Sequence, residues 1–118
     1  MKKIIVVDDE ADNRATVKTV LEREGYEVAT AISADDCLSQ VKKSKIKPDL
    51  ILMDIMMPGT PVKDIVPKLK KIKIAFLSVV RTSEAEREDL LKAENIVDFI
   101  QKPFDITELV EKVKKIIG

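Results

Sequence analysis

The sequence predicts an α/β fold in which an open, doubly wound sheet of five parallel strands is covered by five helices. Five short apolar runs, rich in β-branched residues, alternate with amphipathic stretches from one end of the chain to the other. Such alternation is typical of βα units joined by right-handed crossovers around a parallel sheet. Five units are too few to close an eight-stranded barrel, so an open sheet remains.

The first predicted strand covers residues 4–7, a β-branched run that stops at an acidic pair. Such a run is typical of a strand buried on both faces. A helix is expected to follow and to end at Gly25, because glycine readily takes the left-handed backbone that terminates a helix. The positions that carry its helical period are Val17, Val20, Leu21 and Glu24.

Residues 26–32 predict the second strand, and residues 50–53, after Pro48, predict the third. Between these strands, Ser33 has the character of a residue that caps the N-terminus of a helix. Cys37 lies on the apolar stripe of that helix and is expected to be a small buried hydrophobic residue. The stripe comprises Ala34, Cys37, Leu38 and Val41.

The second half of the chain predicts two further strands, at residues 74–77 and 96–100. Residues 62–69 have apolar side chains at helical spacing, but Pro67 among them should break or kink a helix. We therefore expect a shortened or displaced third helix. Residues 84–93 predict a polar fourth helix with few apolar anchors.

The last predicted helix carries the clearest signals of any element. Asp105 and Glu108 form a pair like a capping box at its start, and Gly118 follows its end. Its apolar residues recur at helical spacing and are expected to share one buried face. This face comprises Ile106, Leu109, Val110, Val113, Ile116 and Ile117.

Length and charge limit the class of protein. A chain of 118 residues fits one domain, and its 21 basic residues are balanced by 21 acidic residues. This balance argues against a chain whose main task is to bind a nucleic-acid backbone. One local basic segment is expected to be a solvated helix face; it comprises Lys63, Lys68, Lys70, Lys71 and Lys73.

Composition also limits location and chemistry. No apolar run approaches the roughly 18–20 residues that cross a bilayer, so no membrane insertion is expected. The short apolar run near the N-terminus is too brief for a signal peptide, so we expect a cytoplasmic location. The chain has one cysteine and no histidine. Any chemistry must therefore use carboxylates, hydroxyls and lysines.

Matched polar groups follow four of the five predicted strands. Asp8 and Asp9 follow the first strand, Asp54 the third and Ser78 the fourth, while Lys102 lies just past the fifth. The carboxyl ends of parallel strands meet at one edge of a doubly wound sheet, which is where ligands bind. Three carboxylates that close together repel one another, and a hard cation such as Mg²⁺ removes the repulsion.

The remaining groups suit a phosphoryl ligand. The Ser78 hydroxyl can donate to one phosphoryl oxygen, and the Lys102 ammonium can pair with another. Asp54 is then the candidate nucleophile that attacks phosphorus in line. Each residue alone has a simpler interpretation, such as a helix cap for Asp8 or Asp9 and a turn former for Asp54. Their convergence at one edge favours the phosphoryl site.

These residues resemble the receiver domain of two-component response regulators, and the resemblance covers essentially the whole chain. Residues 4–10 look like the first strand and acidic pair of the family, residues 50–59 like its phosphoacceptor segment, and residues 99–104 like its last strand and lysine turn. The resemblance implies a flavodoxin-like fold with strand order 2-1-3-4-5. Residues 1–118 would form a single CheY-like receiver domain.

The resemblance also implies a function in phosphorelay signal transduction. The chain would act as a stand-alone response regulator that takes a phosphoryl group onto Asp54. The donor would be the phosphohistidine of a histidine kinase or phosphotransfer protein, or a small acyl phosphate. Such a domain catalyses only its own phosphorylation and dephosphorylation, so it is a signalling phosphoprotein rather than an enzyme. With no effector domain after Gly118, output would be by docking to a downstream target protein or by relay.

By position, the resemblance implies a role for each residue of the metal site. Asp9 and Asp54 would bind Mg²⁺ directly together with the backbone carbonyl of Met56. Asp8 would act through a water molecule.

The resemblance assigns the phosphoryl group and the switch to three other residues. Ser78 and Lys102 would bind the phosphoryl oxygens, and the bond between Lys102 and Pro103 would be cis. Phe99 falls at the position of the switch aromatic of the family. On phosphorylation, this ring and the Ser78 hydroxyl would move inward and reshape the surface of the fourth helix, fifth strand and fifth helix.

Three positions depart from the family pattern. Val79 stands where alanine or glycine is usual, and its extra methyl groups predict slow phosphorylation or a long-lived phosphoryl group. Residues 60–62 replace a turn that usually contains glycine. Asn95 stands where a glycine commonly precedes the last strand, and we expect it to be tolerated because asparagine accepts a left-handed backbone.

Two other functions remain as alternatives. The first is a phosphatase with an aspartyl phosphate intermediate, but Asp8 is followed two residues later by Glu10 instead of a second aspartate, and there is no room for a cap domain. The second is a receiver-like interaction module that no longer takes phosphate. The intact acidic, hydroxyl and lysine positions argue against this module, and Val79 favours it weakly.

Overall fold

The computed structural model describes the chain except for residues 1, 44–46, 56–61, 70, 79–92 and 102–104. Its five strands form one parallel sheet in the order β2-β1-β3-β4-β5, so the predicted fold class and strand order are confirmed. The strands are β1 (Lys3–Val7), β2 (Glu27–Ala31), β3 (Leu50–Asp54), β4 (Lys73–Ser78) and β5 (Ile96–Gln101).

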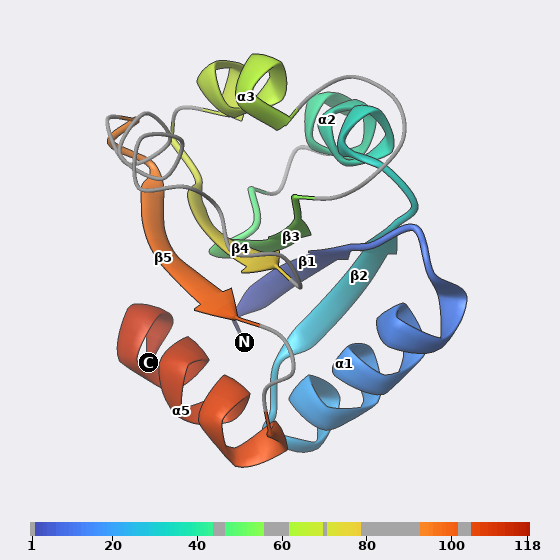
Figure 1. The fold of residues 1–118 in the computed structure, drawn as a ribbon, viewed down its shortest axis with the longest axis vertical. Coiled ribbons are helices and arrows are strands. Elements are labelled where there is room, and N and C mark those ends of the chain that lie inside the picture. The colour runs from blue at the N-terminus through green and yellow to red at the C-terminus, as the bar shows by residue number, and fades with distance from the viewer. Residues whose placement is uncertain (1, 44–46, 56–61, 70, 79–92, 102–104) are drawn as a thin grey trace.

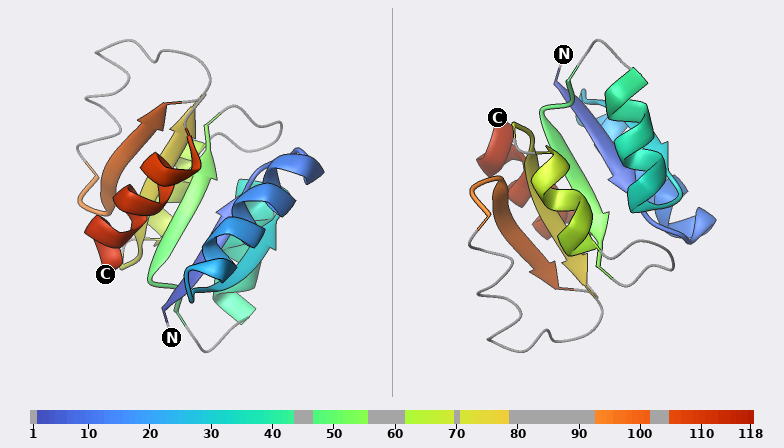
Figure 2. Two further views of the ribbon diagram at one scale, coloured as in Figure 1. Left: turned by 90° about the horizontal axis from the view of Figure 1, so that it is seen from below. Right: turned by 90° about the horizontal axis from the view of Figure 1, so that it is seen from above.

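Helices cover both faces of the sheet. The helix pair α1 and α5 packs on one face, while α2 and α3 pack on the other (Figures 1 and 2). The predicted fourth helix, residues 84–93, lies outside the described residues except for Ala93, which is in a bend. No helix in the described part of the chain is long and apolar enough to span a bilayer. The described helices are α1 (Ala11–Arg23), α2 (Ala34–Lys43), α3 (Val62–Ile65), the 3₁₀-helix η1 (Val66–Leu69) and α5 (Ile106–Ile117).

The central strands β1 and β3 are mainly apolar because their alternate side chains enter two separate cores. In β1, Ile5 and Val7 join the core under α2 and α3, whereas Ile4 and Val6 join the core under α1 and α5. The same alternation divides the side chains of β3, and all five of its residues are buried. This confirms that β1 is buried on both faces, and it gives the sheet a rigid centre from which its polar ends project.

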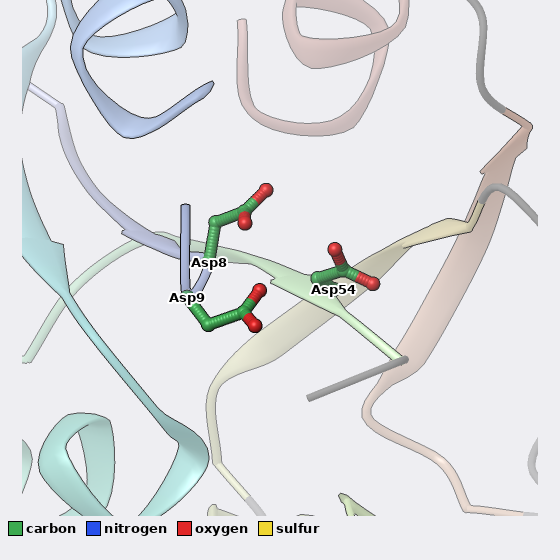
Figure 3. A group of neighbouring side chains, drawn as sticks. All are labelled: Asp8, Asp9 and Asp54. Carbon is green, nitrogen blue, oxygen red and sulfur yellow. The ribbon is translucent and has the colours of Figure 1, made fainter. Parts of the chain in front are cut away.

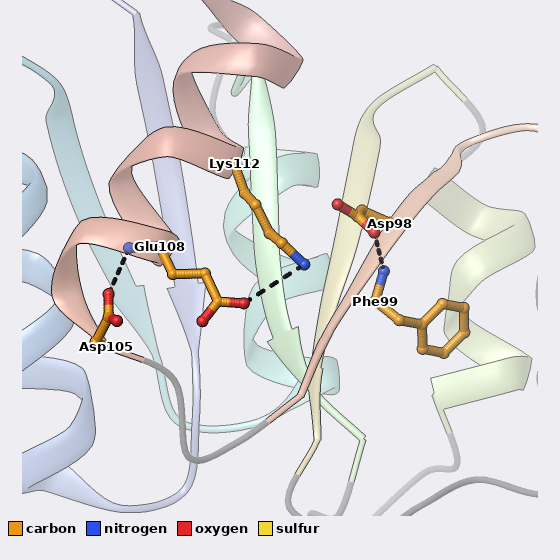
Figure 4. A network of polar contacts seen from close by, with 5 residues as sticks. All are labelled: Asp98, Phe99, Asp105, Glu108 and Lys112. Carbon is orange, nitrogen blue, oxygen red and sulfur yellow. Dashed lines mark hydrogen bonds and ion pairs between the residues drawn. The ribbon is translucent and has the colours of Figure 1, made fainter.

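The helix ends form largely as the sequence predicts. The Ser33 hydroxyl accepts a hydrogen bond of 3.0 Å from the backbone N–H of Asp36, at the start of α2. The Asp105 carboxylate accepts one of 2.7 Å from the backbone N–H of Glu108, at the start of α5 (Figure 4). Gly25, just past α1, has a φ of +93°, which is the left-handed backbone expected of a helix terminator.

One apolar residue of the last helix departs from the prediction. Leu109, Val113 and Ile117 are buried against the sheet at a four-residue spacing. Ile106 is 55% exposed, so its assignment to the buried face is wrong. The reason is its position on the first turn of α5, where it lines an open hollow together with Val20 of α1.

The third helix is short, as Pro67 predicts. Regular α-helix ends at Ile65, and Val66–Leu69 continue as a 3₁₀ turn that contains the proline. Proline has no N–H and its ring clashes with the preceding turn, so it ends an α-helix. The apolar side chains of Val66 and Leu69 remain buried.

Asn95 stabilises this irregular segment, and it does so in a way that the sequence did not predict. No described residue other than glycine has a positive φ, so the expectation of a left-handed backbone at Asn95 is wrong. Its buried side-chain amide instead donates hydrogen bonds to the carbonyl oxygens of Val66 and Leu69, at 3.1 and 3.0 Å. The Leu69 carbonyl also accepts a hydrogen bond of 3.0 Å from the Ile72 N–H, so the amide of Asn95 adds a second donor where the irregular segment ends.

We therefore expect Asn95→Ala to lower the free energy of unfolding by about 1–3 kcal/mol, since the buried amide's hydrogen bonds to the carbonyls of Val66 and Leu69 would be lost. Asn13→Ala is the matched control. Its amide bonds only the exposed Glu10 carboxylate, and its effect should stay within about 0.5 kcal/mol. Urea unfolding, monitored by circular dichroism, measures the change in the free energy of unfolding for both variants. Equal effects of the two substitutions would contradict this role of Asn95.

Cys37 is fully buried on α2, as the sequence predicts. Burial, with a smaller contribution from the Asp36 carboxylate, raises the pKa of the Cys37 thiol from 9.0 to about 12. Between pH 9 and pH 12, the Cys37 thiol therefore keeps its proton in the folded protein and loses it in the unfolded chain. The stability that this thiol contributes is present below pH 9 and is lost as the pH rises toward 12.

Cys37 should consequently react with a thiol reagent at pH 8 roughly a hundredfold or more slowly in the native protein than in urea. Native stability should also fall between pH 9 and pH 12 more steeply in the parent chain than in Cys37→Ala. Labelling of the native protein as fast as in urea would contradict the burial of the Cys37 thiol.

Candidate metal centre

Three carboxylates meet at the carboxyl edge of the sheet. Asp8 and Asp9 directly follow β1, and Asp54 ends β3. Strands β1 and β3 are paired in parallel, with Val7 beside Met53, so the residues that follow them are neighbours. One carboxylate oxygen from each aspartate lies within 4.8 Å of the others (Figure 3). The structure thus brings together side chains that are 45 residues apart in the sequence.

The three side chains differ in their access to solvent. Asp8 is 2% exposed and Asp54 is 6% exposed, while Asp9 is exposed. Two of the carboxylates therefore project from the buried ends of strands, and the third closes the group on the solvent side. An ion can reach this group from the side of Asp9.

Backbone hydrogen bonds hold the turn that carries Asp8 and Asp9. The Asp8 N–H donates to the carbonyl of Ala31, at 3.2 Å, which ties the turn to the end of β2. The Asp8 carboxylate accepts a hydrogen bond of 2.9 Å from the Glu10 N–H. One oxygen of Asp8 is thereby engaged by the backbone, and the turn is fixed before any ligand arrives.

The sequence reasoning missed Arg14, which also supports this turn. Its guanidinium Nη1 donates to the backbone carbonyl of Asp8 at 2.7 Å. The signal was a basic residue on the first turns of α1, four positions after Glu10, whose carbonyl accepts the Arg14 N–H. Side chains on this part of the helix reach back toward its N-terminal end, where the acidic turn lies.

The donor set fits a hard divalent cation. All three groups are carboxylates, and oxygen ligands suit Mg²⁺ or Ca²⁺ better than softer metals. Two unit charges 4.8 Å apart repel by roughly 3 kcal/mol at an effective dielectric constant of about 20. A bound cation replaces this repulsion with attraction, and the exposed side of the group leaves room for water or a phosphate oxygen.

The other predicted site residues are described only in part. The backbone of Ser78 ends β4, one residue beyond Leu77, which pairs with Asp54. Its side chain lies outside the description, as do Met56, Val79 and Lys102 together with Pro103 and the turn at residues 60–61. The expectations about them remain predictions.

Phe99 lies on β5 and is partly buried. Its ring packs 5.4 Å from the ring of Phe76, centroid to centroid, with 43° between the ring planes. Both rings belong to the core on the face of α2 and α3. The Phe99 N–H donates to the carboxylate of Asp98 at 2.7 Å, and Figure 4 shows the two side chains on opposite faces of the strand.

The chain is similar to response regulators in both sequence comparisons. The family model of the response regulator receiver domain matches residues 4–114. The alkaline phosphatase synthesis transcriptional regulatory protein PhoP of Bacillus subtilis is 33% identical over 98% of the chain, and the response regulator SaeR of Staphylococcus aureus is 30% identical over 99%. The chain spans about half the length of these relatives, 48% of PhoP and 51% of SaeR.

Solved structures give the same result for the fold. A CheY-like receiver domain protein from Methanospirillum hungatei superposes with a TM-score of 0.84 at 33% identity, covering 99% of this chain and 94% of that one. The response regulator TrrA from Thermotoga maritima, solved in complex with Mg²⁺ and BeF, superposes with a TM-score of 0.81 at 34% identity, covering 98% and 99%.

We expect Asp9→Asn to stabilise the protein in metal-free buffer by about 0.5–1 kcal/mol, because it removes part of the repulsion within the cluster and Asp9 is partly screened by water. The same substitution should abolish most of the stabilisation that millimolar Mg²⁺ gives the parent chain. Thermal unfolding with EDTA and with Mg²⁺ measures both effects. Asp12→Asn, on an exposed position of α1, is the control and should keep the Mg²⁺ response.

Proposed function

The chain belongs to the receiver domains of response regulators, and from this premise we propose that it accepts a phosphoryl group on Asp54. The donor is the phosphohistidine of a histidine kinase or phosphotransfer protein, or a small acyl phosphate. The observation that carries the proposal is the convergence of Asp8, Asp9 and Asp54, whose oxygens lie within 4.8 Å of one another at the carboxyl edge of the sheet.

In this proposal the acidic cluster holds Mg²⁺. Asp9, Asp54 and the backbone carbonyl of Met56 are the direct ligands, and Asp8 acts through a water molecule. The engagement of one Asp8 oxygen by the Glu10 N–H supports the indirect role of Asp8. When bound, Mg²⁺ supplies positive charge against the negative oxygens of the transferring phosphoryl group.

The chain itself supplies the nucleophile and its position. A carboxylate oxygen of Asp54 attacks phosphorus in line; the bond from phosphorus to the donor imidazole nitrogen breaks, and its electron pair stays on that nitrogen. Asp54 ends a strand that is buried on both faces, so its side chain is held in one place without further ordering. The Ser78 hydroxyl and the Lys102 ammonium bind the other phosphoryl oxygens.

The proposed switch couples Ser78 to Phe99. Ser78 is the second residue after Phe76 on β4, and the ring of Phe76 contacts that of Phe99. In the proposed phosphorylated state, the Ser78 hydroxyl and the ring of Phe99 move inward together. The two states differ in these contacts, and this difference is what lets phosphorylation shift the population between them.

The proposed partners are a histidine kinase or phosphotransfer protein upstream and a target protein downstream. The downstream surface is formed by the fourth helix, β5 and α5. The balance of 21 basic and 21 acidic residues gives the chain no net charge with which to bind nucleic acid. A cytoplasmic location is part of the proposal, and the single, buried thiol of Cys37 is compatible with a reducing compartment.

Incubation with Mg²⁺ and acetyl phosphate, followed by intact mass measurement, tests the function. We expect a single phosphoryl adduct on the parent chain, none on Asp54→Ala, and none when EDTA replaces Mg²⁺. Asp64→Ala, an exposed position on α3, is the matched control and should be phosphorylated like the parent. If Val79 restricts access, the adduct should also form or decay slowly for the family.

Each other outcome favours a different function. A folded parent chain that stays unmodified while binding Mg²⁺ would contradict the proposal and favour an interaction module. An adduct that persists in Asp54→Ala would place the phosphoryl group on another residue. Rapid hydrolysis of unrelated phosphate esters would favour the phosphatase.

A further inference from the structure

A basic pocket lies at the opposite edge of the sheet from the acidic cluster. The pocket has a volume of about 370 Å³, and four lysines line it: Lys2, Lys47, Lys71 and Lys73. They come from segments just before β1, β3 and β4 and from the first residue of β4, so they surround the amino ends of three neighbouring strands. Both ends of the chain lie toward this edge in Figure 2.

We propose that this basic pocket binds a small anion that carries several phosphate groups. The proposal does not depend on phosphorylation of Asp54, because the two sites lie at opposite ends of the strands.

The positive charges of the basic pocket are largely unbalanced. All four lysines are exposed, and within the described part of the chain the ammonium groups of Lys2, Lys47 and Lys71 have no hydrogen bond or ion pair. Asp49 is the one carboxylate in the described lining, and its Oδ2 already accepts a hydrogen bond of 2.8 Å from the Lys3 N–H. Four positive charges therefore face one negative charge.

Helix ends do not account for this grouping. Cationic residues in the last turn of a helix stabilise its free carbonyls, and α1, α2 and α5 each carry their own basic residues there. Lys73 adds to this role, since its Nζ donates to the carbonyl of Ile116 on α5 at 3.3 Å. Lys2, Lys47 and Lys71 lie on connecting segments and have no such carbonyl. Their convergence creates a positive potential that an anion would relieve.

The basic segment does not form a single helix face. That segment was expected to form a solvated helix face, but Lys71 lies in a turn and Lys73 lies in β4. The chain reversal before β4 turns both residues toward the pocket, where they meet Lys2 and Lys47 from distant parts of the sequence.

Size and chemistry indicate the class of ligand. A volume of about 370 Å³ lies within the range of small-molecule sites, whereas nucleic acid requires an extended basic track. No arginine lines the described pocket, and arginine is the residue that pairs with carboxylates in a two-pronged geometry. Lysine binds phosphate as a point charge. Salt screens single charges over about 8 Å, so only an anion with several charges would bind at physiological ionic strength.

Isothermal titration of the full chain with inorganic tripolyphosphate tests the proposal, at about 0.15 M NaCl and with EDTA in place of Mg²⁺. We expect saturable binding of one anion per chain and weaker binding of orthophosphate. The triple variant Lys2→Gln, Lys47→Gln, Lys71→Gln should lose roughly tenfold or more in affinity. The control variant carries the same change in net charge outside the pocket, at Lys18, Lys68 and Lys112, and should lose less than about threefold.

Equal losses in the two variants, or no saturable binding by the parent chain, would overturn the proposal, because general charge attraction would then account for the data. Binding to phosphatidylserine vesicles without binding to tripolyphosphate would also overturn it and would indicate a membrane surface instead. Circular dichroism checks the fold of both variants. If the triple variant does not fold, Lys47→Gln alone replaces it and should still weaken binding more than Lys68→Gln does.

Discussion

Mutual repulsion among Asp8, Asp9 and Asp54 is the constraint on which the rest of the structure depends. The backbones that carry these carboxylates are held side by side, because β1 and β3 are paired along their length and buried on both faces. The fold therefore gathers three carboxylates whose mutual repulsion a hard cation would relieve, and this is why the proposed phosphoryl site lies at the carboxyl edge of the sheet.

Hydrogen bonds hold two irregular segments of the fold in one geometry. Arg14 and the N–H of Glu10 fix the acidic turn, while the amide of Asn95 fixes the irregular end of η1 on the other side of the sheet. In each case a side chain or N–H donates to a backbone or carboxylate oxygen outside the regular hydrogen bonding of helices and strands. The acidic turn is therefore held in one geometry before a phosphoryl ligand binds.

The chain has no net charge, but its charged side chains are unevenly distributed over the fold. The acidic cluster occupies the carboxyl edge of the strands, and the lysines of the basic pocket occupy the amino edge. A field of this kind can guide charged partners to one end of the molecule and anions to the other. Composition alone, with 21 residues of each sign, conceals this separation.

The sequence by itself determined the strands, the short third helix and the gathering of the three aspartates, because hydrophobic period, Pro67 and the geometry of parallel strands are local or topological properties. Only the tertiary structure decided the role of Asn95, the exposure of Ile106 and the basic pocket. Asn95 bonds carbonyls 26 and 29 residues away, and the pocket joins Lys2 to Lys73. Such contacts depend on how packed elements bring distant groups into range, and no local pattern encodes that distance.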